Sequence, residues 1–241
     1  MKTYNIEPEI PGASKAPRAA LNPPEGRRFD IETMKLVHRL FLSPTHVSPS
    51  SVMFCGVDQG SGCSTVCALV ADVLAAQVKG RICLVDANDT NPSLHRFFQI
   101  HNDRGFTNML LDQGRAEHFA HQLPGRDLWV MPNGSAPADL WTLSDTQFVR
   151  SRVLELRGAF RHVIIDMPPA SRYLDALVIG QVVDGVVLVI ESDTTKREMA
   201  RQTKESLEEA NIAVLGAVLN KRKYPIPQFL YSTLRLGQQG T

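Results

Sequence analysis

The residues best suited to chemistry form a glycine-rich turn that is followed directly by hydroxyl side chains. Residues 52–65 read Val-Met-Phe-Cys-Gly-Val-Asp-Gln-Gly-Ser-Gly-Cys-Ser-Thr, an apolar strand that runs into a turn and the start of a helix. Backbone N–H groups at such a helix start hold phosphate, and glycines let the backbone approach it closely. The segment predicts a phosphate-binding loop, with the Ser64 hydroxyl placed to reach Mg²⁺. The predicted binding residues are Gly60, Ser61, Gly62, Cys63, Ser64 and Thr65.

One position departs from the usual pattern, because Cys63 stands where a Lys normally follows the last glycine. Such a Lys supplies a charge-assisted hydrogen bond of ~1.5–3 kcal/mol to the phosphates and stabilises the charge that develops during phosphoryl transfer. Without it, we expect nucleotide binding to be weakened ~10–100-fold or lost, and transfer to suffer more. A basic side chain from elsewhere in the chain or from a neighbouring subunit is an open alternative. The candidates in this chain are Lys79, Arg81, Arg104, Lys196 and Arg197.

Two acidic residues end apolar runs further along the chain. Asp86 ends Ile-Cys-Leu-Val-Asp, and Asp166 ends His-Val-Ile-Ile-Asp. Ligands of an open parallel sheet bind outside the carboxyl ends of its strands, so both carboxylates should lie beside the loop. We predict that Ser64, Asp86 and Asp166 hold Mg²⁺, and that the two carboxylates are the catalytic groups. For each Asp, the alternative is a structural role in capping a turn.

Strands and helices alternate in the order of an α/β fold. Strands are predicted at 52–57, 82–86, 128–131, 162–166, 185–190 and 214–219, and helices at 29–42, 64–78, 92–99, 106–111, 144–157, 172–181 and 195–210. The strands are continuous apolar runs, typical of parallel strands buried on both faces. We predict a single doubly wound α/β P-loop domain at 29–222, with a mostly parallel sheet and helices on both faces. A flexible Pro-rich N-terminal tail at 1–28 and a C-terminal tail at 223–241 flank it.

Composition narrows the class of protein. Hydrophobic residues make up 43% of the 241 residues, enough for a sizeable core, and the net charge of +1 gives no reason to expect nucleic acid or lipid as the main partner. No apolar run reaches the ~18 residues of a membrane span, and the first residues lack a signal-peptide core, so we expect a cytoplasmic protein. Cys63 and Cys67 are four residues apart, which leaves a metal or redox pair open. Because no zinc-like second pair accompanies them, buried reduced thiols are the favoured interpretation.

Three segments in order resemble the Walker-type motifs of the bacterial tyrosine kinases, the capsule and exopolysaccharide autokinases in the MinD/ParA-like branch of P-loop proteins. They are Gly56 to Thr65, Leu-Val-Asp-Ala-Asn-Asp-Thr-Asn-Pro-Ser-Leu-His at 84–95, and Val-Ile-Ile-Asp-Met-Pro-Pro at 163–169. The resemblance covers about residues 29–222. It implies ATP or ADP with Mg²⁺ as cofactors, a tyrosine hydroxyl as phosphate acceptor, and an Asn220 side chain that faces the adenine.

The chain also departs from that family. The second motif usually reads Asp-x-Asp-x-Arg, but here an amide, Asn88, replaces the second acid and Thr90 replaces the Arg. Asp58 stands where the partition ATPases place their signature Lys, which disfavours that subclass. Cys63 and the altered second motif, together with the sparse tyrosine tail described next, favour a pseudokinase slightly over a divergent kinase.

Two further features of the family are present in reduced form. The tyrosine-rich tail that is the kinases' substrate has only Tyr224 and Tyr231 here, so these are candidate phosphoacceptors, with packing residues as the alternative. The family's Glu-x-x-Arg-x-x-Arg helix, used in subunit contacts of a ring, is matched by Glu32, Lys35 and His38. These are candidate oligomer contacts, with an ordinary solvated helix face as the alternative.

The resemblance implies a cytoplasmic protein of exopolysaccharide or capsule biosynthesis, either a divergent tyrosine kinase or a pseudokinase that regulates polymerisation and export. It implies a homo-oligomer that a membrane polysaccharide co-polymerase recruits to the inner face of the plasma membrane. We expect no membrane span in this chain and no nucleic acid among its partners. The alternative is a MinD/ParA-like positioning ATPase, which dimerises with ATP and hydrolyses it slowly.

Overall fold

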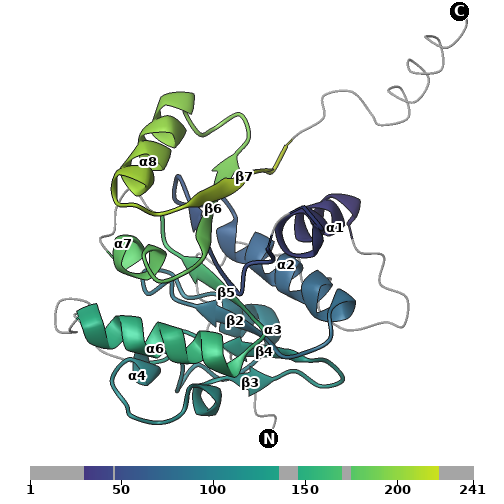
Figure 1. Ribbon diagram of the computed structural model, residues 1–241, viewed down its shortest axis with the longest axis vertical. Coiled ribbons are helices and arrows are strands. Elements are labelled where there is room, and N and C mark those ends of the chain that lie inside the picture. The colour runs from purple at the N-terminus through teal and green to yellow at the C-terminus, as the bar shows by residue number, and fades with distance from the viewer. Residues whose placement is uncertain (1–29, 46, 136–145, 170–174, 223–241) are drawn as a thin grey trace, which may run out of the picture.

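The computed structural model describes residues 30–45, 47–135, 146–169 and 175–222, and in this part of the chain seven strands form one sheet (Figure 1). The strand order is β3-β4-β2-β5-β1-β6-β7, and all pairs are parallel except β3 with β4. The strands are β1 Ser51–Gly56, β2 Ile82–Asp86, β3 His121–Gln122, β4 Leu128–Met131, β5 His162–Met167, β6 Gly185–Glu191 and β7 Val214–Asn220. β1, β2 and β5 are buried along their whole length, as expected for apolar strands covered on both faces.

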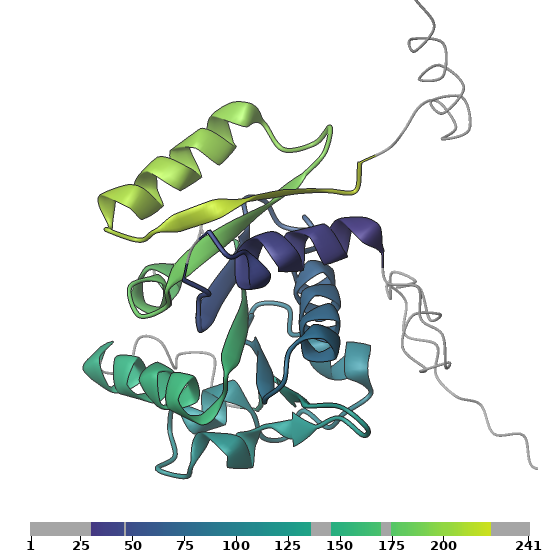
Figure 2. The same ribbon diagram turned by 45° about the vertical axis from the view of Figure 1, so that its right-hand side comes forward.

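Helices cover both faces of the sheet, with α1 and α2 on one side and α6, α7 and α8 on the other (Figures 1 and 2). The first layer contains α1 Ile31–Val37, which continues as a π-helix at His38–Leu42, with α2 Cys63–Gln77 and α3 Leu94–Phe98. The second contains α4 Phe106–Met109, a 3₁₀ helix at Ala116–Phe119, α6 Thr146–Ala159, α7 Asp175–Gly180 and α8 Arg197–Glu209.

Side chains of each strand alternate between the two layers, as the pleat of a strand requires. In β1, Val52 and Phe54 pack in the α1–α2 layer, while Met53 packs in the α6–α7 layer. The cysteines divide the same way: Cys63 and Cys67 lie in the α1–α2 layer, and Cys55 and Cys83 lie in the other. All four are buried and free of disulfide bonds, as predicted.

The predicted elements are confirmed in the described ranges, and their ends differ from prediction by three residues at most. The sequence patterns missed the 3₁₀ helix at Ala116–Phe119 and the strand β3. A two-residue strand has no periodicity to detect, and β3 exists only because His121 and Gln122 pair antiparallel with β4. The predicted tails at 1–28 and 223–241 lie outside the described residues. No described helix is long and apolar enough to cross a lipid bilayer.

At the amino ends of the strands, opposite the glycine-rich loop, one carboxylate joins β1 to β6. Asp184, just before β6, accepts hydrogen bonds from the backbone N–H and hydroxyl groups of both Ser50 and Ser51. It also pairs with the Arg157 guanidinium at 2.6 Å. Burial alone would raise the pKa of Asp184, but the hydrogen bonds from Ser51 and Ser50 and the charge of Arg157 outweigh it and hold that pKa below 3.8.

Candidate phosphate-binding site

The turn between β1 and α2 has the backbone of a phosphate-binding loop. Gly60 and Gly62 take positive φ angles of 85° and 83°, which only glycine adopts without strain. Gly62 is the N-cap of α2, and no side chain caps this helix end. The N–H groups of the first helical turn have no acceptor within their own helix, so those of Cys63, Ser64 and Thr65 are free to bind an anion.

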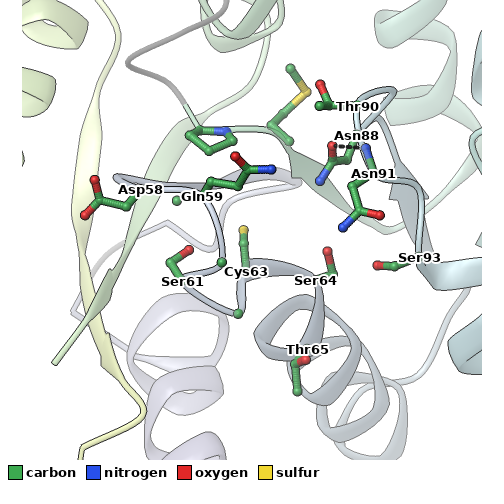
Figure 3. A pocket seen from close by; sticks show the side chains of 15 residues that line it. Asp58, Gln59, Ser61, Cys63, Ser64, Thr65, Asn88, Thr90, Asn91 and Ser93 are labelled. Atoms are coloured by element: carbon green, nitrogen blue, oxygen red, sulfur yellow. Dashed lines mark hydrogen bonds between the residues drawn. The ribbon is translucent and has the colours of Figure 1, made fainter. Parts of the chain in front are cut away.

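A cavity of about 350 Å³ lies above this turn and is lined by the whole segment from Asp58 to Thr65, with Gly56. Figure 3 shows Cys63 and Ser64 pointing into it from the start of α2, with Gln59 on one side and Asn91 on the other. Asp58 and Thr65 line the cavity with part of their atoms, but their side chains point away from its centre. The opposite wall carries amides and hydroxyls: Asn88, Thr90, Asn91 and Ser93. Among its described lining residues there is no Lys or Arg.

Two residues at the end of β7 hold the loop from outside the cavity. The Asn220 amide donates to the Ser61 carbonyl at 2.8 Å, and the Lys221 ammonium donates to the Gly60 carbonyl. Lys221 also pairs with Glu191 at the end of β6, 3.1 Å away. The motifs did not predict the contacts of Lys221 and Glu191, because a short basic run after a strand, here Lys-Arg-Lys at 221–223, carries no positional signal.

Asp86, the last residue of β2, braces the loop that follows it. One of its oxygens accepts the N–H groups of Ser93 and Leu94, each at 2.9 Å, and the other accepts that of Asn88 at 3.2 Å. The carboxyl group is fully buried, which raises its pKa to about 6 even though these three hydrogen bonds act in the opposite direction. Three of its roughly four acceptor positions are thus used by the protein itself, which agrees with the turn-capping alternative.

Asp166 is the penultimate residue of β5. It lies opposite Asp86 of β2 in the sheet register and is also fully buried. Its Oδ1 accepts from the Cys67 thiol at 3.8 Å, and its Oδ2 has no hydrogen-bond partner in the described structure. Burial, followed by repulsion from Asp86, raises the pKa of Asp166 to about 7, against hydrogen bonds from Ser64, Cys63 and Cys67 that lower it. Burial likewise raises the pKa of Cys67 to about 12.

The thiol of Cys63 lies next to Cys67 and Asp166. Its hydrogen bond with Cys67, followed by burial, raises the pKa of Cys63 well above 9.0. Both thiols are therefore neutral at pH 7 in the metal-free protein, and neither places a charge in the phosphate cradle. The position that carries a Lys in the usual loop is occupied here by an uncharged, nearly buried side chain.

Comparisons with known proteins place this chain in a family. A model of the family described as "Cellulose biosynthesis protein BcsQ" matches residues 50–214. Tyrosine-protein kinase YwqD of Bacillus subtilis (strain 168) is 34% identical over 173 residues, which cover 72% of this chain and 73% of YwqD. The chain belongs to the family of bacterial tyrosine-protein kinases. The matched residues 50–214 include the three motifs at 56–65, 84–95 and 163–169.

Solved structures agree with this family in fold. The chimerical protein CapA2B2 has a TM-score of 0.72 and 24% sequence identity, and the match covers 80% of this chain and 84% of that one. The VpsO kinase domain has a TM-score of 0.71 and 22% identity, covering 80% of this chain and 96% of that one. The predicted doubly wound P-loop fold is thus confirmed.

The basic residues predicted as possible replacements for the missing Lys all lie away from the cavity. Lys79 and Arg81 are beyond the far end of α2, a helix of 15 residues that is ~22 Å long, so they cannot reach the loop. Arg104 pairs with Asp112 and stacks over the Phe119 ring. Lys196 and Arg197 are exposed at the start of α8 and do not line the cavity. None of the predicted in-chain replacements for the missing Lys enters the cavity.

Residues predicted for oligomer contacts lie on the exposed side of α1. Glu32 and Lys35 form an ion pair at 2.8 Å, and His38 is exposed in the π-helical continuation. A second cavity of about 620 Å³, lined by Glu32, Lys35 and Asn220 among others, separates this helix from β7. The tail tyrosines Tyr224 and Tyr231 lie outside the described residues.

Proposed function

We propose that this chain is a nucleotide-binding pseudokinase of exopolysaccharide or capsule biosynthesis, which regulates polymer synthesis and export without transferring phosphate itself. The observation that carries the proposal is Cys63: the phosphate-binding loop is built, but the position of its Lys is neutral and no described Lys or Arg lines the cavity. A cradle of N–H groups is sufficient to bind phosphate weakly. The Lys that would add positive charge beside a transferring phosphoryl group is absent from this cradle.

The remaining groups suit a nucleotide with Mg²⁺. The Ser64 hydroxyl points into the cavity, and Asp166 offers a buried oxygen without a partner. Hydroxyl and carboxylate oxygens are the ligands that Mg²⁺ prefers, and the ion when bound neutralises phosphate charge. Asp86 has one acceptor position left. We therefore assign it mainly to holding the loop after β2, with a contact to the metal as a secondary role. Asn220, which lines the second cavity, remains our proposed neighbour of the adenine.

Regulation would then act through assembly. YwqD is named a tyrosine-protein kinase and CapB a putative one. We propose that this chain works as a homo-oligomer, as its resemblance to that family implies. Glu32, Lys35 and His38 present an exposed, charged helix face that suits a contact with a second copy. A membrane polysaccharide co-polymerase would recruit the oligomer from the cytoplasm to the inner face of the plasma membrane.

The test is calorimetric titration of the full chain with ADP and with ATP in the presence of Mg²⁺, next to the variant Cys63→Lys. We expect weak binding to the native protein and binding ~10–100-fold tighter in Cys63→Lys, because the ammonium adds one charge-assisted contact to the phosphates. The matched control is Cys83→Ala, which removes a buried thiol from the opposite face of the sheet and should leave binding unchanged.

Activity is measured on the same samples by mass spectrometry of tyrosine phosphorylation after incubation with ATP. An unmodified native chain agrees with a pseudokinase. Phosphate on Tyr224 or Tyr231 of the native protein would refute it and establish a divergent kinase. ATP-dependent dimerisation with slow hydrolysis would also refute it, in favour of a positioning ATPase.

A further inference from the structure

Two thiols and a carboxylate meet at the base of the phosphate-binding loop. Cys63 and Cys67 lie one turn apart on the same face of α2, and Asp166 reaches them from the end of β5. One ligand atom from each residue lies within 4.8 Å of the other two. Cys67 and Asp166 are fully buried, and Cys63 is 8% exposed on the side that lines the cavity.

This cluster contains an unpaired acceptor. Asp166 Oδ2 is buried without any hydrogen-bond partner among the described residues, although a buried polar group left unpaired costs ~1–3 kcal/mol. No described Lys or Arg forms an ion pair with Asp166, and its neighbour in the sheet is a second acid, Asp86. A cation bound between the two thiols and this carboxyl group would offset the negative charge of the paired acids.

The spacing suits a tetrahedral ion. With Zn–S bonds of ~2.3 Å and Zn–O bonds of ~2.1 Å, ligand atoms at the corners of a tetrahedron are ~3.6–3.8 Å apart. Cys67 Sγ and Asp166 Oδ1 are already 3.8 Å apart. The other ligand separations are 4.8 Å at most, so they need to shorten by ~1 Å, which a rotation of the Cys63 side chain can supply.

We infer that Cys63, Cys67 and Asp166 form a binding site for a thiophilic divalent cation of the zinc class, with its fourth coordination position open to the cavity. Two sulfur ligands select Zn²⁺ over Mg²⁺, which takes oxygen ligands. The ion would lie beside Cys63, near the path of the Lys in the usual loop. The inference goes beyond the proposed function. It shares Asp166 with the proposed nucleotide site, but its three ligands are residues of this chain and do not require nucleotide.

The experiment is a titration of the tag-free full chain with Co²⁺ under a thiol-free reductant, followed by displacement with Zn²⁺. Bound Co²⁺ reports thiolate ligands by charge-transfer absorption and tetrahedral geometry by its visible bands. The variants are Cys63→Ala and Cys67→Ala. The control is Cys83→Ala, which removes a thiol that is as buried as that of Cys67 but lies in the other layer of the core. Thermal unfolding of each metal-free variant verifies that it is folded.

We expect one equivalent of Co²⁺ with thiolate bands in the native chain and in Cys83→Ala, undiminished by excess Mg²⁺. Cys63→Ala and Cys67→Ala should each bind at least ~100-fold more weakly, because the loss of an outer partner alone costs ~10–100-fold and these are direct ligands. Folded Cys63→Ala and Cys67→Ala variants that keep the affinity and the bands would overturn the inference, as would a native chain without thiolate bands. The nucleotide titrations contain Mg²⁺ and no Co²⁺ or Zn²⁺, so they test the proposed function separately.

Discussion

Two glycines of the phosphate-binding loop share a backbone conformation but not an environment, and this difference gives a paired prediction. Gly60 and Gly62 have φ angles of 85° and 83°. A methyl group added at Gly60 would meet no atom within 4 Å, whereas one added at Gly62 would overlap the Asn220 amide nitrogen. That amide holds the loop through the Ser61 carbonyl, so Gly62→Ala must displace it and break the hydrogen bond.

The magnitudes follow from these contacts. Gly60→Ala should lower the free energy of unfolding by ~1–2 kcal/mol, the cost of a left-handed conformation for a residue with a Cβ. Gly62→Ala should cost the same strain plus the Asn220–Ser61 hydrogen bond, ~0.5–1.5 kcal/mol more. Asn220→Ala alone removes only that hydrogen bond. In the double variant Gly62→Ala/Asn220→Ala the bond is lost once, so the combined cost should be smaller than the sum of the single costs.

The assay is urea unfolding of the four variants and the native chain, with free energies taken at a common slope. Equal destabilisation by Gly60→Ala and Gly62→Ala would show that Asn220 does not occupy the space above Gly62. Additive costs in the cycle would show the same. In either case the anchoring of the loop by β7 would be refuted.

Three other perturbations have definite outcomes. Asp86→Asn should destabilise the fold by ~1–3 kcal/mol in urea unfolding, because one of the two carboxylate oxygens becomes an NH2 group that faces an N–H donor. Asp184→Asn should cost ~1–3 kcal/mol at pH 7. Since the folded pKa of Asp184 lies below its unfolded value, its contribution is present at neutral pH and is lost as the pH falls below about 4, so native and variant stabilities should converge in acid. Lys221→Met should change the free energy of unfolding by no more than ~1 kcal/mol, because the ion pair of Lys221 with Glu191 is partly exposed. It should still speed backbone hydrogen exchange in the glycine-rich loop, because the loop loses the hydrogen bond from Lys221 to the Gly60 carbonyl.

The sequence was sufficient to predict the order of the elements, since each strand is a continuous apolar run and each helix begins near a recognisable break. It also predicted that the loop, Asp86 and Asp166 converge, because the carboxyl ends of parallel strands share one edge. The roles of the two acids could not be predicted in the same way. Whether a carboxylate faces backbone N–H groups, as Asp86 does, or lacks a partner, as Asp166 Oδ2 does, depends on loop conformation rather than on residue type.

The same limit applies to the cysteines and to Lys221. A spacing of four residues predicts that Cys63 and Cys67 share a helix face, but the third member of the cluster comes from β5, about 100 residues later. Only the register of the sheet brings Asp166 to that face. Lys221 reaches the loop because β7 ends next to it, which is again a property of the strand order.

Charge balance connects the two proposals. In the usual loop a Lys places a positive charge at the position of Cys63. Here Cys63 is neutral, and two fully buried carboxyl groups remain side by side with no described cation paired to either. Such a pair can be neutralised by a proton, as the pKa of about 7 for Asp166 indicates, or by a metal ion. The replacement of one Lys thus lowers the positive charge available to a phosphate and, by the same step, leaves a buried negative site that a cation can fill.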